Sequence, residues 1–353
     1  MIFILLLLAS VYLQVEPVIA CPSHNNSLNE GYRNCSNSGT LYAVEPVYSN
    51  SDAININDCS SIINLDLNQG YFKACTASSD IFILPSCNLR RPTVLQYRNC
   101  LSHKTIAFIG DSVTRFQYLS LISYLASGLY EELWLWHQKQ HDWVSFFLCF
   151  PERINSSGGG GQFNMSCNGR HGEYESWELK DTVFNFKLIA QQILSNPMSP
   201  VTEASILQAA KDKLSWAVTS GADTIVFNIG IWWVYSIDAL MKAPEGTRGA
   251  ALVRAYETIF YEGYKYKLKS KSNLTLIFKT TTPHNGPHPG FDLYYKLSPM
   301  LNTLAESYGW VVLDVGAVAN RAKADGEAIF HDHVHMKECM NEHFNDLLYN
   351  LVC

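Results

Sequence analysis

The stretch TIAFIGDSVTRFQ, residues 105–117, decides the fold. Its apolar run Thr105–Ile109 predicts a buried strand. In the segment Ser112–Ala126, apolar residues recur with i, i+3 spacing, which is typical of an amphipathic helix. The tripeptide Gly110–Ser112 therefore joins a strand end to a helix N-terminus, where backbone N–H groups and the helix dipole favour negative charge. Such a place suits a serine that carries an acyl group, because the oxyanion of acyl transfer is stabilised there.

Strand-like and helix-like segments alternate along the chain after this stretch. We expect strands at Thr105–Ile109, Thr224–Ile229, Leu274–Thr280 and Trp310–Val315, and helices at Ser112–Ala126, Thr202–Ser220, Ala250–Ser270, Tyr294–Tyr308 and Glu338–Leu351. This alternation predicts an α/β fold with a mainly parallel sheet and helices on both faces. Between Glu131 and Ala190 the pattern is aromatic and irregular, and we expect extra strands and a lid-like insertion there, with a flexible loop at Ser156–Gly161.

Composition limits the class of protein and of partner. The chain has 353 residues, of which 47% are hydrophobic and 16% charged, enough for one large core or a core with a small satellite domain. The net charge is -6 and no basic run exceeds two residues, so we expect no nucleic-acid partner.

The amino terminus reads as a targeting segment. Residues Met1–Val15 are nearly all apolar, but this run is short for a membrane span, which needs about 20 residues. The residues Val18–Ala20 before Cys21 resemble a small-residue cleavage site, so residues 1–20 predict a signal peptide. An uncleaved anchor and a bacterial lipoprotein site at Cys21 remain as alternatives.

The cysteines predict a disulfide framework. The ten are Cys21, Cys35, Cys59, Cys75, Cys87, Cys100, Cys149, Cys167, Cys339 and Cys353. Their number is even and no Cys-x-x-Cys occurs, so five disulfides in an oxidising compartment are expected. Six of the ten lie between Cys21 and Cys100, which predicts a disulfide-rich N-terminal cap at residues 21–100 before a catalytic domain at 101–353.

Glycosylation signals agree with a secretory chain. The pattern Asn-x-Ser/Thr occurs at Asn25, Asn34, Asn155, Asn164 and Asn273. We therefore expect the protein in the secretory pathway, either secreted or in the lumen of the Golgi or endoplasmic reticulum.

Polar residues follow three of the expected strands. Ser112 follows the first, Asn228 closes the second, and Thr280–Asn285, which includes His284, closes the third. In open α/β sheets ligands bind beyond the carboxyl ends of the strands, so these side chains are expected to converge. His284 either contacts substrate or simply ends its strand.

A serine, a histidine and an aspartate have the spacing of a catalytic triad. Asp332 and His335 stand at i, i+3 before the last expected helix, so both side chains face the same way if they share a turn. Ser112 needs a base to take its proton, and the base needs an acid to hold its tautomer. Asn228 and the backbone N–H of Ser112 are candidate oxyanion donors, and Gly169 is a third.

Each of these residues also has a plain structural reading. Ser112 is a favoured helix N-cap, Asp111 is expected to cap rather than to react, and Arg115 can be a solvated helix residue. Trp232 and Trp233 either stack on a sugar ring or belong to the core. Asn228 can be a turn residue at a strand end.

The histidines around Asp332 also suggest a metal site. His331, His333 and His335 alternate around this aspartate, but zinc needs three or four ligands and no cysteine or carboxylate pair supplies a recognisable set. We find no nucleotide-binding signature either. We therefore expect no metal and name no cofactor.

Five blocks follow one another along the chain between Ser86 and Cys353. They are SCNLRR (86–91), GDSVTRFQ (110–117), VFNIGIWW (226–233), KTTTPH (279–284), and DHVH (332–335) followed by NDLLY (345–349). In this order the blocks resemble the trichome-birefringence-like and PC-esterase family, which are polysaccharide O-acetyltransferases and relatives within the SGNH (GDSL) hydrolase superfamily. The chain departs from the family pattern at Ile231, where a histidine is usual, and at His333, where a cysteine is frequent.

The resemblance implies both a fold and a chemistry. The fold is a three-layer, SGNH-hydrolase-like (flavodoxin-like) domain, and the chemistry is a Ser-His-Asp triad with an acyl-serine intermediate and a carbohydrate acceptor. By that match the residues are Ser112 as nucleophile, His335 as base, Asp332 as its orienting acid, and Arg115 and Asn228 as residues that shape the site.

Three functions from two classes follow as hypotheses. The first is an O-acetyltransferase that acts on a carbohydrate hydroxyl, and the second is a secreted carbohydrate or lipid acetylesterase that binds an acetylated glycan. The third is a non-catalytic extracellular glycan-binding module. Because acetyl-CoA is mainly cytosolic, we expect that a transferase in the lumen receives its acetyl groups from a membrane partner.

Overall fold

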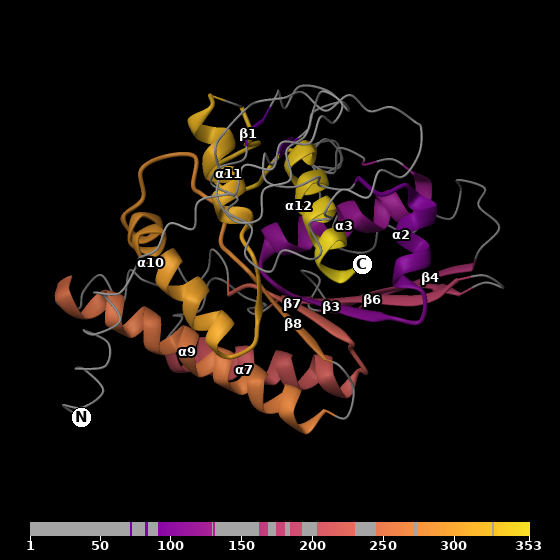
Figure 1. The fold of residues 1–353 in the computed structure, drawn as a ribbon, viewed down its shortest axis with the longest axis horizontal. Helices are drawn as coiled ribbons and strands as arrows, with labels where there is room; N and C mark the ends of the chain where they lie inside the picture. Colours follow the sequence, from indigo (N-terminus) through magenta and orange to yellow (C-terminus); the bar gives the residue numbers. More distant parts are fainter. Residues whose placement is uncertain are drawn as a thin grey trace, which may run out of the picture.

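The structure is a computed structural model. It describes residues 71–72, 82–83, 91–128, 130, 162–168, 174–180, 184–192, 203–229, 245–270, 274–326 and 328–353. In this part of the chain a seven-stranded sheet lies between two layers of helices (Figure 1). The predicted three-layer α/β architecture is therefore confirmed.

The sheet is parallel except at one edge. In spatial order its strands are β4 (Gln162–Asn168), β5 (Tyr174–Lys180), β6 (Asn185–Gln192), β3 (Thr105–Gly110), β7 (Thr224–Phe227), β8 (Thr275–Lys279) and β9 (Val311–Leu313). The strands from β6 to β9 pair in parallel, whereas β4 and β5 pair antiparallel to their neighbours. A separate two-stranded pair joins β1 (Tyr71–Phe72) to β2 (Phe82–Ile83).

Helices cover both faces of the sheet. One face carries α2 (Val94–Leu101), α3 (Ser112–Ser127), α11 (Val315–Ala324) and α12 (Glu338–Val352), and the other carries α7 (Glu203–Thr219), α9 (Glu245–Lys269) and α10 (Pro289–Ser307) (Figure 1). In β3, Ile106 and Phe108 join the core under the first group, while Ala107 and Ile109 join the core under the second. Because the strand is buried on both faces, its sequence is a continuous apolar run rather than an alternation.

Helix α3 is buried on every side. Val113–Ser123 are all buried, although the apolar spacing predicted an amphipathic helix with one solvent-facing side. The reason is α12, which packs over the outer side of α3 and covers residues that spacing alone assigns to the surface. Asn345 on α12 donates a hydrogen bond to the carbonyl of Gln117 on α3, 228 positions earlier in the chain.

The other expected elements are present with shifted ends. α10 begins at Pro289, five residues before the expected Tyr294, because the His288 side chain caps its first turn and proline is favoured at the first helical position. The expected extra strands are β4, β5 and β6. The loop at Ser156–Gly161 lies outside the described residues.

Helix α2 was not predicted, and the expected domain boundary at 100/101 falls inside it. Its residues Tyr97 and Leu101 are fully buried in the main core. The Tyr97 hydroxyl donates to the Asn345 carbonyl at 3.0 Å, and a disulfide joins Cys100 to Cys353. Residues just before 101 are thus built into the same core as α12.

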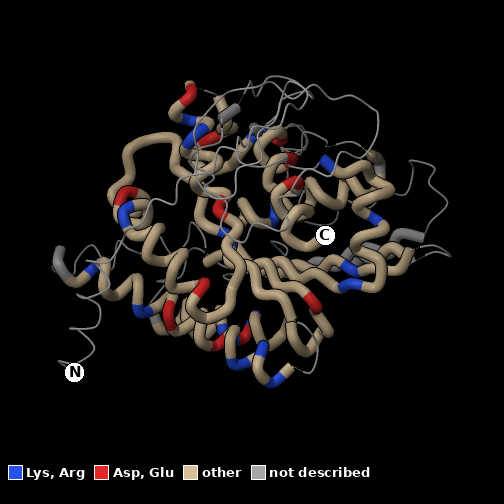
Figure 2. Tube along the Cα trace, in the orientation of Figure 1, with Lys and Arg blue, Asp and Glu red and all other residues tan. Residues whose placement is uncertain are grey.

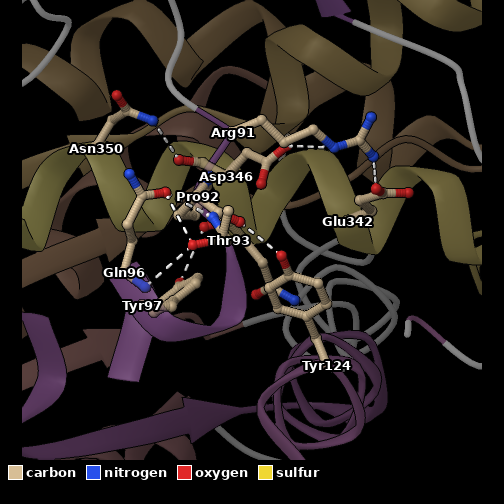
Figure 3. A network of polar contacts seen from close by, with 10 residues as sticks. Arg91, Pro92, Thr93, Gln96, Tyr97, Tyr124, Glu342, Asp346 and Asn350 are labelled. Atoms are coloured by element: carbon tan, nitrogen blue, oxygen red, sulfur yellow. Dashed lines mark hydrogen bonds and ion pairs between the residues drawn. The ribbon is translucent and has the colours of Figure 1, made fainter. Parts of the chain in front are cut away.

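A polar network ties the entry of α2 to α12 and α3 (Figure 3). Arg91 forms an ion pair with Glu342 and approaches Asp346, with 3.8 Å between Nε and Oδ2. The Tyr124 hydroxyl on α3 donates to the carbonyl of Pro92 at 2.6 Å. The segment before α2 is therefore held on two helices at once.

The Asp346 carboxyl makes the stability of the fold depend on pH. It is 5% exposed, and burial raises its pKa to about 7 despite the opposing charge of Arg91. Because this folded-state pKa lies above that of the unfolded chain, its contribution is fully present below pH ~4 and is lost as pH rises toward 7. We expect the unfolding free energy of wild type, relative to Asp346→Asn, to fall by roughly 2–4 kcal/mol over this range.

Urea denaturation of both proteins at several pH values measures this difference. Burial also lowers the pKa of His343, to about 3, which acts in the opposite direction but is common to both proteins and cancels. A difference that stays constant between pH 4 and 7 would contradict the role of Asp346.

Lys and Arg positions and Asp and Glu positions are interspersed along the outer helices (Figure 2). Among the described residues, none of the helices combines the length and the apolarity that a membrane crossing requires.

Candidate active site

The turn between β3 and α3 presents Ser112. The Asp111 side chain accepts a hydrogen bond from the Thr114 N–H at 3.0 Å, so Asp111 is the N-cap of α3 and Ser112 is the first residue of the helix. The alternative in which Ser112 only caps the helix is therefore wrong. Gly110 is required, because a Cβ there would lie 2.4 Å from the Thr114 hydroxyl oxygen.

Ser112, His335 and Asp332 form one hydrogen-bonded chain. His335 Nε2 lies 3.0 Å from Ser112 Oγ, and His335 Nδ1 lies 2.7 Å from Asp332 Oδ2. Since an ionised carboxylate can only accept, Nδ1 carries the proton and Nε2 is left to accept the proton of the serine hydroxyl. The three residues that the sequence predicted to meet do so across 223 positions.

The Asp332 carboxylate is held in place and kept ionised. Its Oδ1 accepts the backbone N–H groups of Val334 and His335, both at 2.8 Å. Partial burial acts to raise the pKa of Asp332, but the hydrogen bonds from His335 and Val334 outweigh it and hold that pKa well below its usual range. The carboxylate is consequently charged whenever the fold is intact near neutral pH.

The loop that carries the histidine is closed on itself. Phe330 and Met336 form an antiparallel bridge, and the His331 N–H donates to the His335 carbonyl at 2.9 Å. The ring of Phe116 on α3 packs against the imidazole of His335, with 5.0 Å between ring centres. Loop closure and this ring contact orient the base toward Ser112.

Asn285 fastens the same loop to the end of β8. Its N–H donates to the His333 carbonyl at 2.8 Å, and its side-chain amide donates to the Asp332 carbonyl at 3.2 Å. Asn285 was not among the predicted site residues. Its place directly after His284, in the polar segment that closes the third expected strand, was the signal available.

Asn228 lies beside the β3–α3 turn, and its hydrogen bonds run to the neighbouring strands of the sheet. It is 3% exposed, its N–H donates to the Ile109 carbonyl at 2.8 Å, and its side-chain amide donates to the Lys279 carbonyl at 2.7 Å. With Asp111 and Thr114 it lines a small pocket beneath the turn. The hydrogen bonds of the described residues thus tie Asn228 to β3 and β8, and they include none to Ser112.

The remaining predicted site residues differ in their setting. Arg115 is buried on α3, with 5% exposure, so the reading of a solvated helix residue is wrong. His284 is half-buried after β8, and its ring is parallel to that of His333, with 5.5 Å between centres. Gly169, Trp232 and Trp233 lie outside the described residues. Within the described ranges no group of three or more His, Cys, Asp or Glu side chains is placed to hold a metal ion.

Two sequence relatives of the chain are both xylan O-acetyltransferases. No family model matches the chain. Two rice proteins (Oryza sativa subsp. japonica), Xylan O-acetyltransferase 13 and Xylan O-acetyltransferase 12, are each 24% identical over 186 residues, which is 52% of this chain and 31% of each relative. The matched stretch therefore spans about a third of the length of these relatives.

Solved structures with a related outline are more distant. LAE5, an α/β hydrolase from the metagenome of Lake Arreo in Spain, is 14% identical, with a TM-score of 0.40 over 72% of this chain and 98% of its own. A catalytic mutant of Axe2, an acetylxylan esterase from Geobacillus stearothermophilus, is 14% identical, with a TM-score of 0.37 over 71% of this chain and 94% of its own. The sequence relatives confirm the resemblance to the trichome-birefringence-like and PC-esterase family that the motifs of the chain indicated.

Proposed function

We propose that this protein moves an acetyl group onto a carbohydrate hydroxyl through an acyl-serine intermediate at Ser112. The observation that carries the proposal is the chain of hydrogen bonds from Ser112 Oγ through His335 to Asp332. The acetyl group and the carbohydrate acceptor come from the similarity to the rice xylan O-acetyltransferases.

The first half of the reaction loads the enzyme. Ser112 Oγ attacks the carbonyl carbon of the acetyl donor while His335 Nε2 takes the hydroxyl proton. The carbonyl π electrons move to oxygen, and when they return the bond to the donor breaks. The leaving group takes the proton from His335, and the acetyl group remains as an ester on Ser112.

The second half transfers the acetyl group. A sugar hydroxyl gives its proton to His335 and attacks the ester carbonyl, and Ser112 recovers its proton when it leaves. Asp332 stabilises the imidazolium that forms in each half and remains a carboxylate throughout.

The oxyanion is proposed to lie at the N-terminus of α3. Within the first turn, the N–H of Thr114 is engaged by Asp111 Oδ1 and that of Arg115 by the Asp111 carbonyl. The N–H groups of Ser112 and Val113 have no carbonyl four residues earlier within the helix, which leaves them for a ligand.

Further residues complete the proposed site. We keep Asn228 and Gly169 as proposed oxyanion donors, Arg115 as a residue that shapes the site, and Trp232, Trp233 and His284 as proposed contacts to the acceptor. We further propose that the protein works in the secretory pathway, with a signal peptide at residues 1–20 and a membrane partner as the source of acetyl groups.

Partition of the acetyl group separates a transferase from an esterase. The protein is incubated with an acetyl ester donor, with and without xylo-oligosaccharides, and acetylated glycan and free acetate are followed by mass spectrometry. We expect added glycan to take acetyl groups at the expense of acetate, because the acceptor hydroxyl competes with water for the acyl-serine. Release of acetate alone at all glycan concentrations would favour the acetylesterase.

A further inference from the structure

Lys279, the last residue of β8, is a buried cation that the triad does not use. It is 1% exposed, although lysine is almost never fully buried without a partner. Its side chain lines the pocket beneath the β3–α3 turn together with Asp111 and Thr114, and that pocket has no room for a water molecule. The ammonium group must therefore be stabilised by the protein itself.

The contacts of Lys279 reach two sides of the site. Its Nζ lies 3.4 Å from the hydroxyl oxygen of Thr114 and 5.8 Å from the centre of the Phe344 ring on α12. Its carbonyl accepts the side-chain amide of Asn228 at 2.7 Å. One residue thus connects the end of β8 to both the helix that begins at Ser112 and the residue that closes β7.

Thr114 in turn contacts the residues of the β3–α3 turn that precede Ser112. The Thr114 N–H donates to Asp111 Oδ1, and its side chain lies against Gly110 so closely that a Cβ there would not fit. Any shift of Thr114 must therefore move Gly110 and Asp111, the two residues directly before Ser112. The Asp111 carboxylate also attracts the ammonium group through space.

We propose that Lys279 is a positioning residue, whose ammonium group holds Thr114 and Asp111 and thereby fixes the turn that aims Ser112 Oγ at His335. The proposal rests on the proposed nucleophilic role of Ser112. A charge is useful here because a neutral side chain of the same length fills the space but does not hold the Asp111 carboxylate. Replacing a buried ion by an apolar group is often tolerated for stability, so the loss should appear in catalysis.

Three variants test this role, with hydrolysis of a chromogenic acetate as the readout. We expect Lys279→Met to lower kcat by roughly 10- to 100-fold with little change in KM, because a misplaced nucleophile slows chemistry without weakening substrate binding. Lys279→Arg keeps the charge in a larger side chain and should lose less of kcat than Lys279→Met. The matched control is Lys104→Met, since the half-buried Lys104 donates to the Val352 carbonyl and lies before β3, at the opposite end of that strand from Ser112.

The pH profile supplies a readout that a purely structural lysine would not move. Burial lowers the pKa of Lys279 to about 8 against the opposing effect of Asp111, while Thr114 and Phe344, which its ammonium group also contacts within the described part of the chain, are uncharged. Activity of wild type should therefore fall as pH rises through about 8, whereas Lys279→Arg should keep its activity there, since a guanidinium keeps its charge up to pH ~12. Superimposable profiles would overturn the proposal.

The outcomes separate this proposal from the proposed function. A folded Lys279→Met protein with the kcat of wild type overturns the positioning role alone. Wild type that neither hydrolyses acetate nor reacts with a fluorophosphonate overturns the proposed function instead. Should Lys279→Met fail to fold, Thr114→Val removes the hydroxyl and keeps the shape. A several-fold lower kcat then supports the role, and an unchanged kcat contradicts it.

Discussion

Replacement of Ser112 by alanine is expected to abolish hydrolysis of a chromogenic acetate, with kcat reduced by at least ~10³-fold. The hydroxyl lies 3.0 Å from His335 Nε2, and without it no acyl-enzyme can form. Binding of substrate should change little, because the lost atom acts on the reacting carbonyl rather than on the rest of the molecule. Steady-state kinetics measures the loss of kcat, and mass spectrometry of the trapped protein shows whether the acyl-enzyme forms.

Ser120 provides the matched control on the same helix. It is fully buried, and its hydroxyl has no hydrogen-bond partner among the described residues, so Ser120→Ala should keep full activity. Activity retained by Ser112→Ala would refute the assignment of the nucleophile. A folded wild-type protein that a fluorophosphonate does not label would favour the glycan-binding module.

Asp332→Asn is expected to lower kcat by about 10⁴-fold, the loss known for the corresponding change in Ser-His-Asp triads. The loop N–H groups of Val334 and His335 need an acceptor at Oδ1, so the asparagine oxygen takes that place and its NH₂ group faces His335 Nδ1. That NH₂ group donates, which forces the proton of the imidazole onto Nε2. The histidine then has no lone pair to offer Ser112.

This prediction separates a tautomer effect from a folding effect. The loop geometry is preserved in Asp332→Asn, so the protein should still unfold cooperatively, at a somewhat lower temperature because the charge that His335 and Val334 stabilise is gone, while activity falls by orders of magnitude. The control is Asp325→Asn, which removes an exposed carboxylate paired with Arg321 at 3.1 Å and should leave both quantities unchanged. Activity of Asp332→Asn within tenfold of wild type would show that Asp332 does not orient the base.

The sequence predicted the triad because each member stood in a recognisable local setting. Ser112 follows an apolar strand and precedes a helix, and parallel strands bring their carboxyl ends to one edge of a sheet. The spacing of Asp332 and His335 was interpreted as one turn leading into the last helix. In the structure they face each other across a turn in which Asp332 caps the loop N–H groups, and α12 begins only at Glu338. The contact between Asp332 and His335 was predicted correctly, although the turn that joins them is not helical.

The supporting residues were not predicted because their roles arise from tertiary contacts. Lys279 stands at the end of an apolar strand, where a lysine reads as solvent-facing, and only the packing of α3 and α12 buries it. Asn228 was proposed as an oxyanion donor from its place at a strand end, but the hydrogen bond from its amide to the carbonyl of Lys279 on the neighbouring strand is a contact that periodicity does not reveal. α2 is only eight residues long, and the hydrogen bond that fixes its buried side joins Tyr97 to Asn345, 248 positions further along the chain.

The cover that α12 places over α3 has a consequence for biosynthesis. The ribosome delivers α3 long before α12, since Gln117 and Asn345 are 228 positions apart. Throughout that interval the side of α3 that α12 covers in the folded protein has no native neighbour to shield its apolar residues from water, and such surfaces favour aggregation of nascent chains. We therefore expect shortened chains that stop before α12 to yield insoluble product, measured as the soluble fraction after expression, whereas chains that include α12 should stay soluble.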